Sequence, residues 1–298
     1  MTNRPIAMIG LGLMGSRMAV RLLAAGHPLR GFDPDPDRSS EFARAGGTPT
    51  GSAAESVEGC WAALLSLPNS DVSREVCLGT GGIGSGSTTP LTVYDATTGR
   101  PEDAVTIAEG LAGHGITYVD STVSGNGELA ERGELVVMMG GPREAFEAGR
   151  PIFEAIGRSH HHVGPVGAGS RMKLIVNHVL AIHRMALAES LVVAELAGID
   201  LESTLEVLKD SLAYSKAMDA WGERMVAADH DPPFSRLRQS HKDSRLIVDH
   251  GVGLGATMDL AQVVRAALSE GEVDGLGDFD NSAVVEVVRR RAGIGRLP

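Results

Sequence analysis

The sequence predicts a doubly wound α/β domain followed by an all-α domain, with a long helix joining the two. Short apolar runs rich in β-branched residues alternate with helical patterns up to about residue 163, and this alternation is typical of a parallel α/β sheet. After residue 164 the helical patterns continue without a convincing strand. We therefore expect a first domain over residues 1–164 and an all-helical second domain over residues 165–298.

Seven apolar runs are expected to form the strands of the sheet. They cover residues 6–10, 28–33, 61–67, 91–97, 116–121, 134–140 and, more weakly, 160–164. Two of the helical segments between them end on Gly26 and Gly115, in the manner of helix C-caps. The glycine-rich stretch at 79–90 is expected to be a flexible surface connection within the first domain.

The second domain is expected to begin with its longest helix. Residues 170–196 are apolar on most sides and contain neither glycine nor proline, which predicts a largely buried helix. Further helical patterns cover residues 201–212, 216–228, 234–251, 257–271 and 278–291. This apolar helix surface is more than one short domain should leave in water, so a homodimer or homotetramer is expected.

Composition and charge exclude several classes of protein. The chain carries 38 acidic and 27 basic side chains, for a formal net charge of −11, which opposes the basic surface that nucleic-acid binding requires. Cys60 and Cys77 are too few for a disulfide framework. No run reaches the roughly 18 apolar residues of a membrane span, and glycines and arginines interrupt the first apolar run where a signal peptide needs its core. We expect a soluble, cytoplasmic protein without nucleic-acid or membrane partners.

A glycine-rich turn directly follows the first predicted strand. It reads Gly10-Leu11-Gly12-Leu13-Met14-Gly15 and opens a predicted helix. Such a turn lets the backbone approach a pyrophosphate, which the unpaired N–H groups of the helix N-terminus can bind. Asp33 ends the second strand, 18 residues after Gly15, where a carboxylate can accept from a ribose 2′-OH and repels a 2′-phosphate. The pattern predicts a Rossmann-type domain that prefers NAD, although Arg38 could reach a 2′-phosphate and favour NADP.

A polar segment follows the fifth strand. Residues 120–127 read Asp-Ser-Thr-Val-Ser-Gly-Asn-Gly, at the carboxyl end of a strand, where ligands bind in open α/β sheets. The Ser124 hydroxyl, the Asn126 amide and exposed backbone N–H groups could together hold a substrate carboxylate. The same composition also suits a plain turn selected for backbone freedom, and spacing alone does not decide between the two.

A lysine and an asparagine lie four residues apart at the start of the long apolar helix. Lys173 and Asn177 therefore project from one face of that helix. A lysine beside the apolar runs that follow is partly desolvated, which suits a general acid or base near neutral pH. Without further support, however, a lysine at a helix start is more simply a solvated side chain.

Nearly the whole chain resembles the β-hydroxyacid dehydrogenases, the group of 3-hydroxyisobutyrate, tartronate semialdehyde and L-threonate dehydrogenases. IGLGLMGSRMAVRLLAAGH resembles their cofactor signature, LSLPN their third-strand segment and DATTGRP their D-x-S-T-x-x-P element. DSTVSGNGELAERGELVVMMGG is similar to the substrate segment D-A-P-V-S-G-G, GAGSRMKLIVNH to the helix G-x-G-x-x-x-K-x-x-N-N, and HKD to a late K-D pair.

The resemblance implies an NAD(P)-dependent 3-hydroxyacid dehydrogenase and a role for each matched residue. Lys173 would be the general acid/base and Asn177 would orient substrate and lysine, while Ser124, Gly125 and Asn126 would bind the substrate carboxylate. Lys242 would close over the site from the helical domain. The residues that the resemblance and the glycine motif assign to the cofactor are Gly10, Leu11, Gly12, Leu13, Met14, Gly15, Asp33, Leu67, Pro68, Thr97, Thr98 and Lys242.

Departures from the family pattern fall in the substrate segment and helix. Asn126 replaces the second glycine of S-G-G, Ser121-Thr122 replaces A-P, and Val176 replaces the first asparagine of N-N, so the reaction class is better defined than the substrate. An imine reductase remains an alternative, although that group typically lacks the lysine. A 6-phosphogluconate dehydrogenase is disfavoured by the chain's length and by the missing histidine three residues after Lys173. A nicotinamide-binding protein without turnover is the third alternative.

Three basic features are not expected to carry chemistry. His160, His161 and His162 alternate between the faces of a strand and cannot easily ligate one ion, so we expect an edge-strand role and no metal site. His178 lies about 100 degrees round the helix from Asn177 and is expected in a core or interface. The arginines at 289–291 complement the negative end of a helix dipole.

Overall fold

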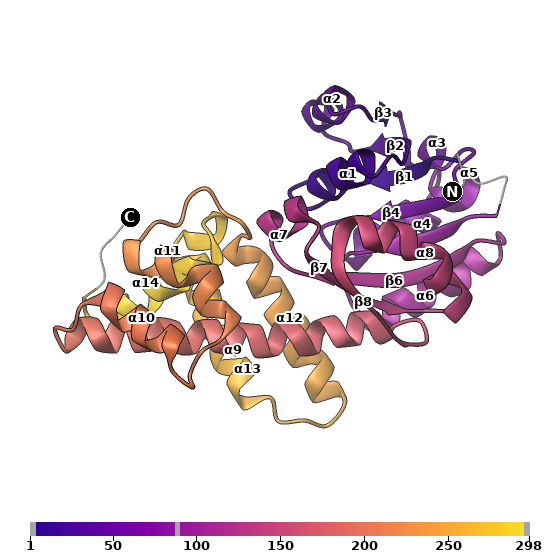
Figure 1. The fold of residues 1–298 in the computed structure, drawn as a ribbon. Helices are drawn as coiled ribbons and strands as arrows, with labels where there is room; N and C mark the ends of the chain where they lie inside the picture. Colours follow the sequence, from indigo (N-terminus) through magenta and orange to yellow (C-terminus); the bar gives the residue numbers. More distant parts are fainter. Residues whose placement is uncertain (1–3, 87–89, 295–298) are drawn as a thin grey trace. The chain divides into compact units, whose positions relative to one another are not determined.

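The computed structural model describes residues 4–86 and 90–294 and divides the chain into two compact units (Figure 1). Unit 1 comprises residues 1–173 and unit 2 residues 174–298. The helix α9 (Ala168–Leu196) belongs to both, because its first turn packs on the sheet of unit 1 and the rest is the first helix of unit 2. The boundary predicted from sequence, between residues 164 and 165, lies just before this helix.

Unit 1 is built on one eight-stranded sheet with the order β3-β2-β1-β4-β5-β6-β7-β8. Its strands are β1 (Ile6–Ile9), β2 (Leu29–Phe32), β3 (Thr48–Pro49), β4 (Ala62–Leu65), β5 (Thr92–Asp95), β6 (Thr117–Ser124), β7 (Leu135–Gly140) and β8 (Gly157–Gly164). The chain leaves β1 towards β2 and β3, and then returns to β4 on the other side of β1. The doubly wound prediction is confirmed, and its switch point lies between β1 and β4, where such sheets bind ligands.

The sheet is mostly parallel, as predicted, and departs from that prediction at one pair of strands. β6 and β7 are antiparallel, with Asp120 opposite Gly140 and Ser124 opposite Val136, whereas the other strand pairs of this sheet are parallel. The connection between them holds only the short helix α7 (Gly127–Arg132), and a parallel crossover usually needs a dozen or more residues. The two-residue edge strand β3 was not predicted, because two residues carry no readable alternation.

Helices cover both faces of the sheet because successive side chains of each strand point to opposite sides. Ile6 and Met8 of β1 face the core beneath α1 (Gly15–Ala24) and α8 (Arg143–Ile156), while Ala7 and Ile9 face the opposite core. The helices on that second side are α3 (Ala53–Ser56), α4 (Ser70–Leu78), α5 (Ile83–Gly86) and α6 (Pro101–Ala112). The remaining helix, α2 (Pro36–Arg44), follows β2.

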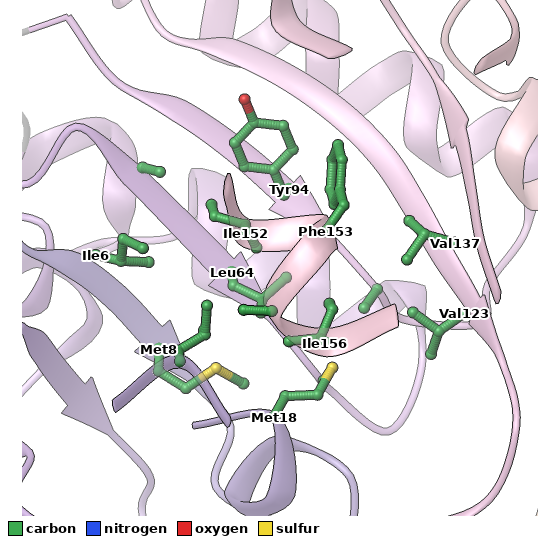
Figure 2. Close-up of a cluster of buried hydrophobic side chains, with 14 of the residues drawn as sticks. Ile6, Met8, Met18, Leu64, Tyr94, Val123, Val137, Ile152, Phe153 and Ile156 are labelled. Atoms are coloured by element: carbon green, nitrogen blue, oxygen red, sulfur yellow. The ribbon is translucent and has the colours of Figure 1, made fainter. Parts of the chain in front are cut away.

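Figure 2 shows the first of these cores, where side chains of α8 lie over the strands. The rings of Phe153 and Tyr94 meet edge to face with centroids 5.4 Å apart, and the Tyr94 hydroxyl donates to the Ala145 carbonyl over 2.8 Å. Fully burying such side chains stabilises the fold by about 1.5–3 kcal/mol each. This core fixes the central strands whose carboxyl ends carry the candidate site.

The glycine-rich stretch at 79–90 differs from the expected flexible connection. Ile83 to Gly86 form α5, and the Ile83 side chain is fully buried. A Cβ on Gly86 would lie 2.3 Å from the Ala54 carbonyl oxygen, so glycine here permits close packing. The part of the prediction that concerns residues 87–89 lies outside the described residues.

The regular secondary structure in the described residues of unit 2 is helical, apart from an isolated bridge between Arg236 and Asp280. After α9 it contains α10 (Leu201–Asp210), a π-helical turn (Met218–Gly222), α11 (Glu223–Ala227), α12 (Leu237–Gly253), α13 (Asp259–Val273), two 3₁₀ turns (Leu276–Asp278 and Asn281–Ala283) and α14 (Val284–Arg291). Leu187 and Leu191 of α9 pack in one core with Trp221 of the π-helical turn. The all-α prediction is confirmed.

The prediction that α9 is largely buried is wrong for several of its apolar residues. The residues Ile175, Val179 and Val193 are 57%, 48% and 65% exposed, although Leu174, Leu187 and Leu191 are buried. A single copy of the helical unit therefore leaves apolar helix surface uncovered. Among the described residues, no helix combines the length and hydropathy that crossing a bilayer requires.

Candidate active site

The three glycines of the first turn serve three different purposes. Gly10 directly follows β1 and has φ +88°, and a Cβ there would stand 2.3 Å from the carbonyl oxygen of Ser66, which directly follows β4, so a larger residue would clash at position 10. A Cβ on Gly15 would stand 1.9 Å from the Gly10 carbonyl oxygen, so α1 could not pack as closely on the turn. At Gly12 the nearest atom to a Cβ would be Arg38 Nη1, 3.3 Å away. Glycine at position 12 therefore leaves room for a ligand to approach the backbone, which fits a pyrophosphate.

Asp33 is held against this turn by its neighbours. One carboxylate oxygen accepts from the Leu11 N–H over 2.7 Å, and the other accepts from the Asp35 N–H over 3.0 Å. Arg38 Nη1 lies 3.5 Å from Asp33 Oδ2, and Arg38 Nε lies 3.3 Å from Asp35 Oδ2. The guanidinium that could reach a 2′-phosphate is therefore already paired with two carboxylates. The Asp33 side chain itself is 5% exposed.

The loops after β4 and β5 are tied together beside the turn. The Leu67 N–H donates to Thr97 Oγ1 over 3.0 Å, and the Thr97 N–H donates to Asp95 Oδ1 over 2.9 Å. Burial raises the pKa of Asp95, and hydrogen bonds from Thr97 and Tyr118 oppose that rise. This arrangement places Leu67 and Thr97 at the carboxyl edge of the sheet. Pro68, which follows Leu67, is exposed there, and Thr98 is partly buried.

The segment after β6 is shaped by a helix cap and by a glycine. Asn126 precedes α7, and its Oδ1 accepts from the Leu129 N–H over 3.0 Å. This bond uses the amide oxygen of Asn126 for the cap of α7. Gly125 has φ +144°, and a Cβ there would stand 2.6 Å from Leu135 Cδ2. Gly125 is exposed and Ser124 is partly buried, so the segment presents backbone and hydroxyl groups at the surface of unit 1.

Asp120 fastens the start of α9 to the sheet. It lies on β6 and is almost completely buried, and its two carboxylate oxygens accept from the backbone N–H groups of Gly167 and Ser170 over 2.8 and 2.7 Å. Burial raises the Asp120 pKa to about 6, although these N–H groups oppose the rise. The unpaired N–H groups of a helix start need such an acceptor. The first turn of α9 thus has a fixed place on β6.

A second residue of the same strand completes this anchor. Thr122 Oγ1 donates to the Gly169 carbonyl over 2.9 Å. Glycine is required at position 169, because a Cβ would stand 2.3 Å from the Asp120 carbonyl oxygen. Lys173 follows this anchored turn and is partly buried. Sequence reasoning left Asp120 and Thr122 without individual roles, and the available signal was the run of polar residues Asp120-Ser121-Thr122 within a predicted strand.

In unit 2 a carboxylate connects two of the predicted residues. Asp243 Oδ2 accepts from Asn177 Nδ2 over 3.1 Å, and Asp243 Oδ1 lies 3.0 Å from the Lys242 ammonium. The Lys242 and Asp243 side chains are 18% and 15% exposed. The sequence indicates Asp243 only as half of the K-D pair, because no spacing reveals that α12 brings it to α9.

The charge of Asp243 also acts on Arg184, which is two turns beyond Asn177 on α9. Burial lowers the Arg184 pKa to about 10, and the carboxylates of Asp280 and Asp243 oppose that change. The guanidinium carbon lies 4.9 Å from the centre of the Trp221 ring.

The three consecutive histidines lie on β8, at the edge of the sheet, as predicted. His160 and His162 pack on the Phe146 ring, with centroid distances of 5.9 and 5.6 Å. No group of three His, Cys, Asp or Glu side chains within reach of one metal ion occurs in the described part of the chain. Cys60 and Cys77 are buried free thiols, and burial raises the pKa of each.

Fold and site together define a class of protein. A doubly wound sheet carries a glycine turn open at Gly12 and an acidic residue after β2, which is the arrangement of a dinucleotide-binding oxidoreductase domain. An all-α unit, joined through a helix that bears a lysine and an asparagine one turn apart, accompanies it.

Comparisons with known proteins assign the family. Residues 5–164 match the family model described as the NAD binding domain of 6-phosphogluconate dehydrogenase. Residues 167–288 match the model described as NAD-binding of NADP-dependent 3-hydroxyisobutyrate dehydrogenase. The 3-sulfolactaldehyde reductase of Escherichia coli K12 is 30% identical over 97% of this chain and 97% of its own length. The solved Mycobacterium tuberculosis 3-hydroxyisobutyrate dehydrogenase with L-serine is 29% identical, covers 96% of this chain and 99% of its own, and has a TM-score of 0.86.

The chain belongs to the β-hydroxyacid dehydrogenase family, as its sequence motifs had indicated. It is an NAD(P)-dependent oxidoreductase that acts on a CH–OH group. An imine reductase from Myxococcus stipitatus is 18% identical with a TM-score of 0.64, over 96% of this chain and 99% of its own. That likeness shows a shared fold only.

Proposed function

We propose that this enzyme transfers a hydride between NAD and a small β-hydroxyacid of the 3-hydroxyisobutyrate type, with Lys173 as the general acid and base. One observation carries the proposal. The strand β6 anchors the start of α9 through Asp120 and Thr122, and it then leads into the segment Ser124–Asn126. A single rigid strand therefore positions both the proton-transfer lysine and the proposed carboxylate-binding segment.

Each residue of this proposal has a defined chemical task. The Lys173 ammonium donates its proton to the carbonyl oxygen in reduction, and the neutral amine accepts the hydroxyl proton in oxidation. The Ser124 hydroxyl and the backbone of Gly125 donate to the substrate carboxylate. The Asn126 Oδ1 caps α7, so its Nδ2 is the donor that we assign to the same carboxylate. The bound nicotinamide supplies the hydride acceptor or donor.

Asp243 defines which atom of Asn177 serves the reaction. Because Asn177 Nδ2 donates to Asp243, the amide oxygen is the atom that we assign to the substrate hydroxyl or to the Lys173 ammonium. The Asp243 carboxylate also lies 3.0 Å from the ammonium of Lys242. We assign that lysine to the cofactor, because its positive charge complements the anionic dinucleotide.

The preference for NAD rests on Asp33 and Arg38. A 2′-phosphate brought to this turn would meet the buried carboxylate of Asp33, and Arg38 is paired with Asp33 and Asp35. The residues proposed to hold the dinucleotide are Gly10, Leu11, Gly12, Leu13, Met14, Gly15, Asp33, Leu67, Pro68, Thr97, Thr98 and Lys242.

Two broader properties belong to the same proposal. The exposed Ile175, Val179 and Val193 on α9 support a homodimer or homotetramer, and a monomer mass from light scattering at micromolar concentration would refute this. The two free, buried cysteines support a reducing compartment such as the cytoplasm.

The test is a steady-state screen that follows nicotinamide absorbance. NAD and NADP are each offered with 3-hydroxyisobutyrate, glycerate, threonate and 3-hydroxypropionate. We expect turnover with at least one acid and a higher kcat/KM with NAD. Cofactor binding without turnover of any β-hydroxyacid would refute the proposed substrate class, and a higher kcat/KM with NADP would refute the cofactor preference.

A further inference from the structure

Arg17 joins the glycine turn to the helix that follows the proposed carboxylate-binding segment. It lies in the first turn of α1, and its Nη1 donates to the Leu13 carbonyl over 2.5 Å. Its Nε donates to Glu131 Oε1 of α7 over 2.7 Å. One guanidinium therefore bonds to the glycine turn (residues 10–15) and to α7 at the same time. Neither the sequence motifs nor the family resemblance assigns it a role.

The Arg17 side chain also packs against the start of α7. A Cβ on Gly127, the first residue of α7, would stand 3.0 Å from Arg17 Nε and 3.1 Å from its Cζ. The guanidinium thus packs directly on the α7 backbone, next to the cap formed by Asn126. The Arg17 side chain is 28% exposed, so it is partly shielded from the water that weakens fully exposed ion pairs.

We infer that Arg17 is a positioning residue that couples cofactor binding to carboxylate binding. Ordering of the glycine turn by a dinucleotide also orders the Leu13 carbonyl, and through Arg17 it orders the start of α7 and the segment Ser124–Asn126. The first ligand to bind provides the free energy of this ordering, so the second ligand binds more tightly, which is positive cooperativity. The inference rests on the proposed function, since it needs a hydroxyacid at Ser124–Asn126.

Arg21 provides a matched control within the same helix. It lies one turn further along α1, and its Nε donates to the Ala155 carbonyl of α8 over 3.2 Å. It also packs on Gly133 at the other end of α7, where a Cβ would stand 2.9 Å from Arg21 Nη2. Arg21 therefore secures α7 as Arg17 does, but its hydrogen bond goes to α8 and not to the glycine turn. A purely structural role would make the two arginines equivalent.

The experiment measures the affinity of NADH by its fluorescence, with and without saturating 3-hydroxypropionate. These two reduced ligands form a ternary complex that cannot turn over. We expect 3-hydroxypropionate to tighten NADH binding to the wild-type enzyme. Arg17→Gln is expected to reduce this tightening about five- to tenfold, with a higher KM for the acid, a similar kcat and little change in the affinity for NADH alone. Arg21→Gln is expected to keep the wild-type tightening.

Two further variants separate geometry from charge. Arg17→Lys keeps the positive charge, but a single ammonium cannot reproduce the planar fork that serves both acceptors, so it is expected to lose the coupling as Arg17→Gln does. Glu131→Ala removes the acceptor of Arg17 on α7 and should reduce the tightening of NADH binding as much as Arg17→Gln does. The double variant with Arg17→Gln should show no additional reduction. Glu131→Ala also tests the inference if Arg17 variants fold poorly.

The outcomes are distinguishable from those of the proposed function. An enzyme that oxidises β-hydroxyacids but shows equal tightening in wild type, Arg17→Gln and Glu131→Ala would overturn the inference alone. If Arg17→Gln and Arg21→Gln reduce the tightening of NADH binding equally, Arg17 has only a structural role and the inference is wrong. Both proposals would be overturned if the wild-type enzyme oxidises no acid of the panel and binds NADH no more tightly when 3-hydroxypropionate is present.

Discussion

Replacing Asp120 by asparagine tests how the start of α9 is held. The carboxylate is almost fully buried and accepts from the N–H groups of Gly167 and Ser170. Its pKa rises from 3.8 to about 6, with burial as the main cause, and this rise corresponds to about 3 kcal/mol. Asparagine has nearly the same shape and does not titrate.

The sign of the pH effect follows from the two pKa values. Between pH 3.8 and about 6 the folded chain keeps the Asp120 proton that the unfolded chain has lost. The wild-type free energy of unfolding, relative to that of Asp120→Asn, should therefore fall as pH rises through this window, by up to about 3 kcal/mol. Other carboxylates contribute equally to both proteins and cancel in the difference.

Urea unfolding of both proteins at several values between pH 4.5 and 7.5 measures that difference. Stability of the wild type should exceed that of the variant by more at pH 4.5 than at pH 7.5. A difference that does not depend on pH would show that burial leaves the Asp120 pKa unchanged. A difference that grows with pH would show that the two N–H groups outweigh burial, and the reasoning would then be wrong.

Three further predictions concern the cofactor turn and the second unit. Gly12→Ala should keep the fold but weaken NAD binding by about 1.4 kcal/mol or more, a factor of ten in the dissociation constant, as measured by calorimetric titration. Gly15→Ala should lower the free energy of unfolding in urea by about 1–3 kcal/mol, because its Cβ would stand 1.9 Å from the Gly10 carbonyl oxygen. Asp33→Asn keeps an acceptor for the Leu11 N–H but removes the buried negative charge that would repel a 2′-phosphate, while Arg38 stays paired with Asp35. The ratio of kcat/KM with NADP to that with NAD should therefore rise about tenfold. Asn177→Ala and Asp243→Ala should lower kcat/KM by similar factors, with the double variant within about threefold of either, because Asp243 acts through the Asn177 amide.

Each of these predictions has an outcome that contradicts it. Normal NAD affinity in Gly12→Ala would show that no ligand approaches the backbone at that glycine. An unchanged cofactor ratio in Asp33→Asn would mean that the Asp33 charge does not set the preference. Fully additive losses in the Asn177 and Asp243 variants would show that the two residues act independently.

The fold and the cofactor turn were readable from the sequence because their causes are local. Alternating apolar runs predicted seven strands close to their observed bounds. The glycine spacing predicted the turn, in which each of the three glycines is needed for a different structural reason. The antiparallel pairing of β6 and β7 was missed, because only the length of the connection indicated it.

The interactions that organise the site join residues far apart in the sequence. Asp120 bonds to residues 47 and 50 positions away, Arg17 to Glu131 at 114 positions, and Asn177 to Asp243 at 66 positions. No spacing or periodicity reports such pairs in a single sequence. The exposure of Ile175 and Val179 was missed for a related reason, since an apolar pattern predicts that a surface is covered but does not say what covers it.

The most direct test of the central claim replaces Lys173 by alanine in the intact enzyme. Turnover of the best β-hydroxyacid is measured together with the affinity for NADH. Loss of a positioned general acid and base should lower kcat by about 10²- to 10⁴-fold, with NADH affinity within about twofold of wild type. If Lys173→Ala retains near wild-type kcat/KM, Lys173 is not the proton-transfer residue and the proposed mechanism is wrong.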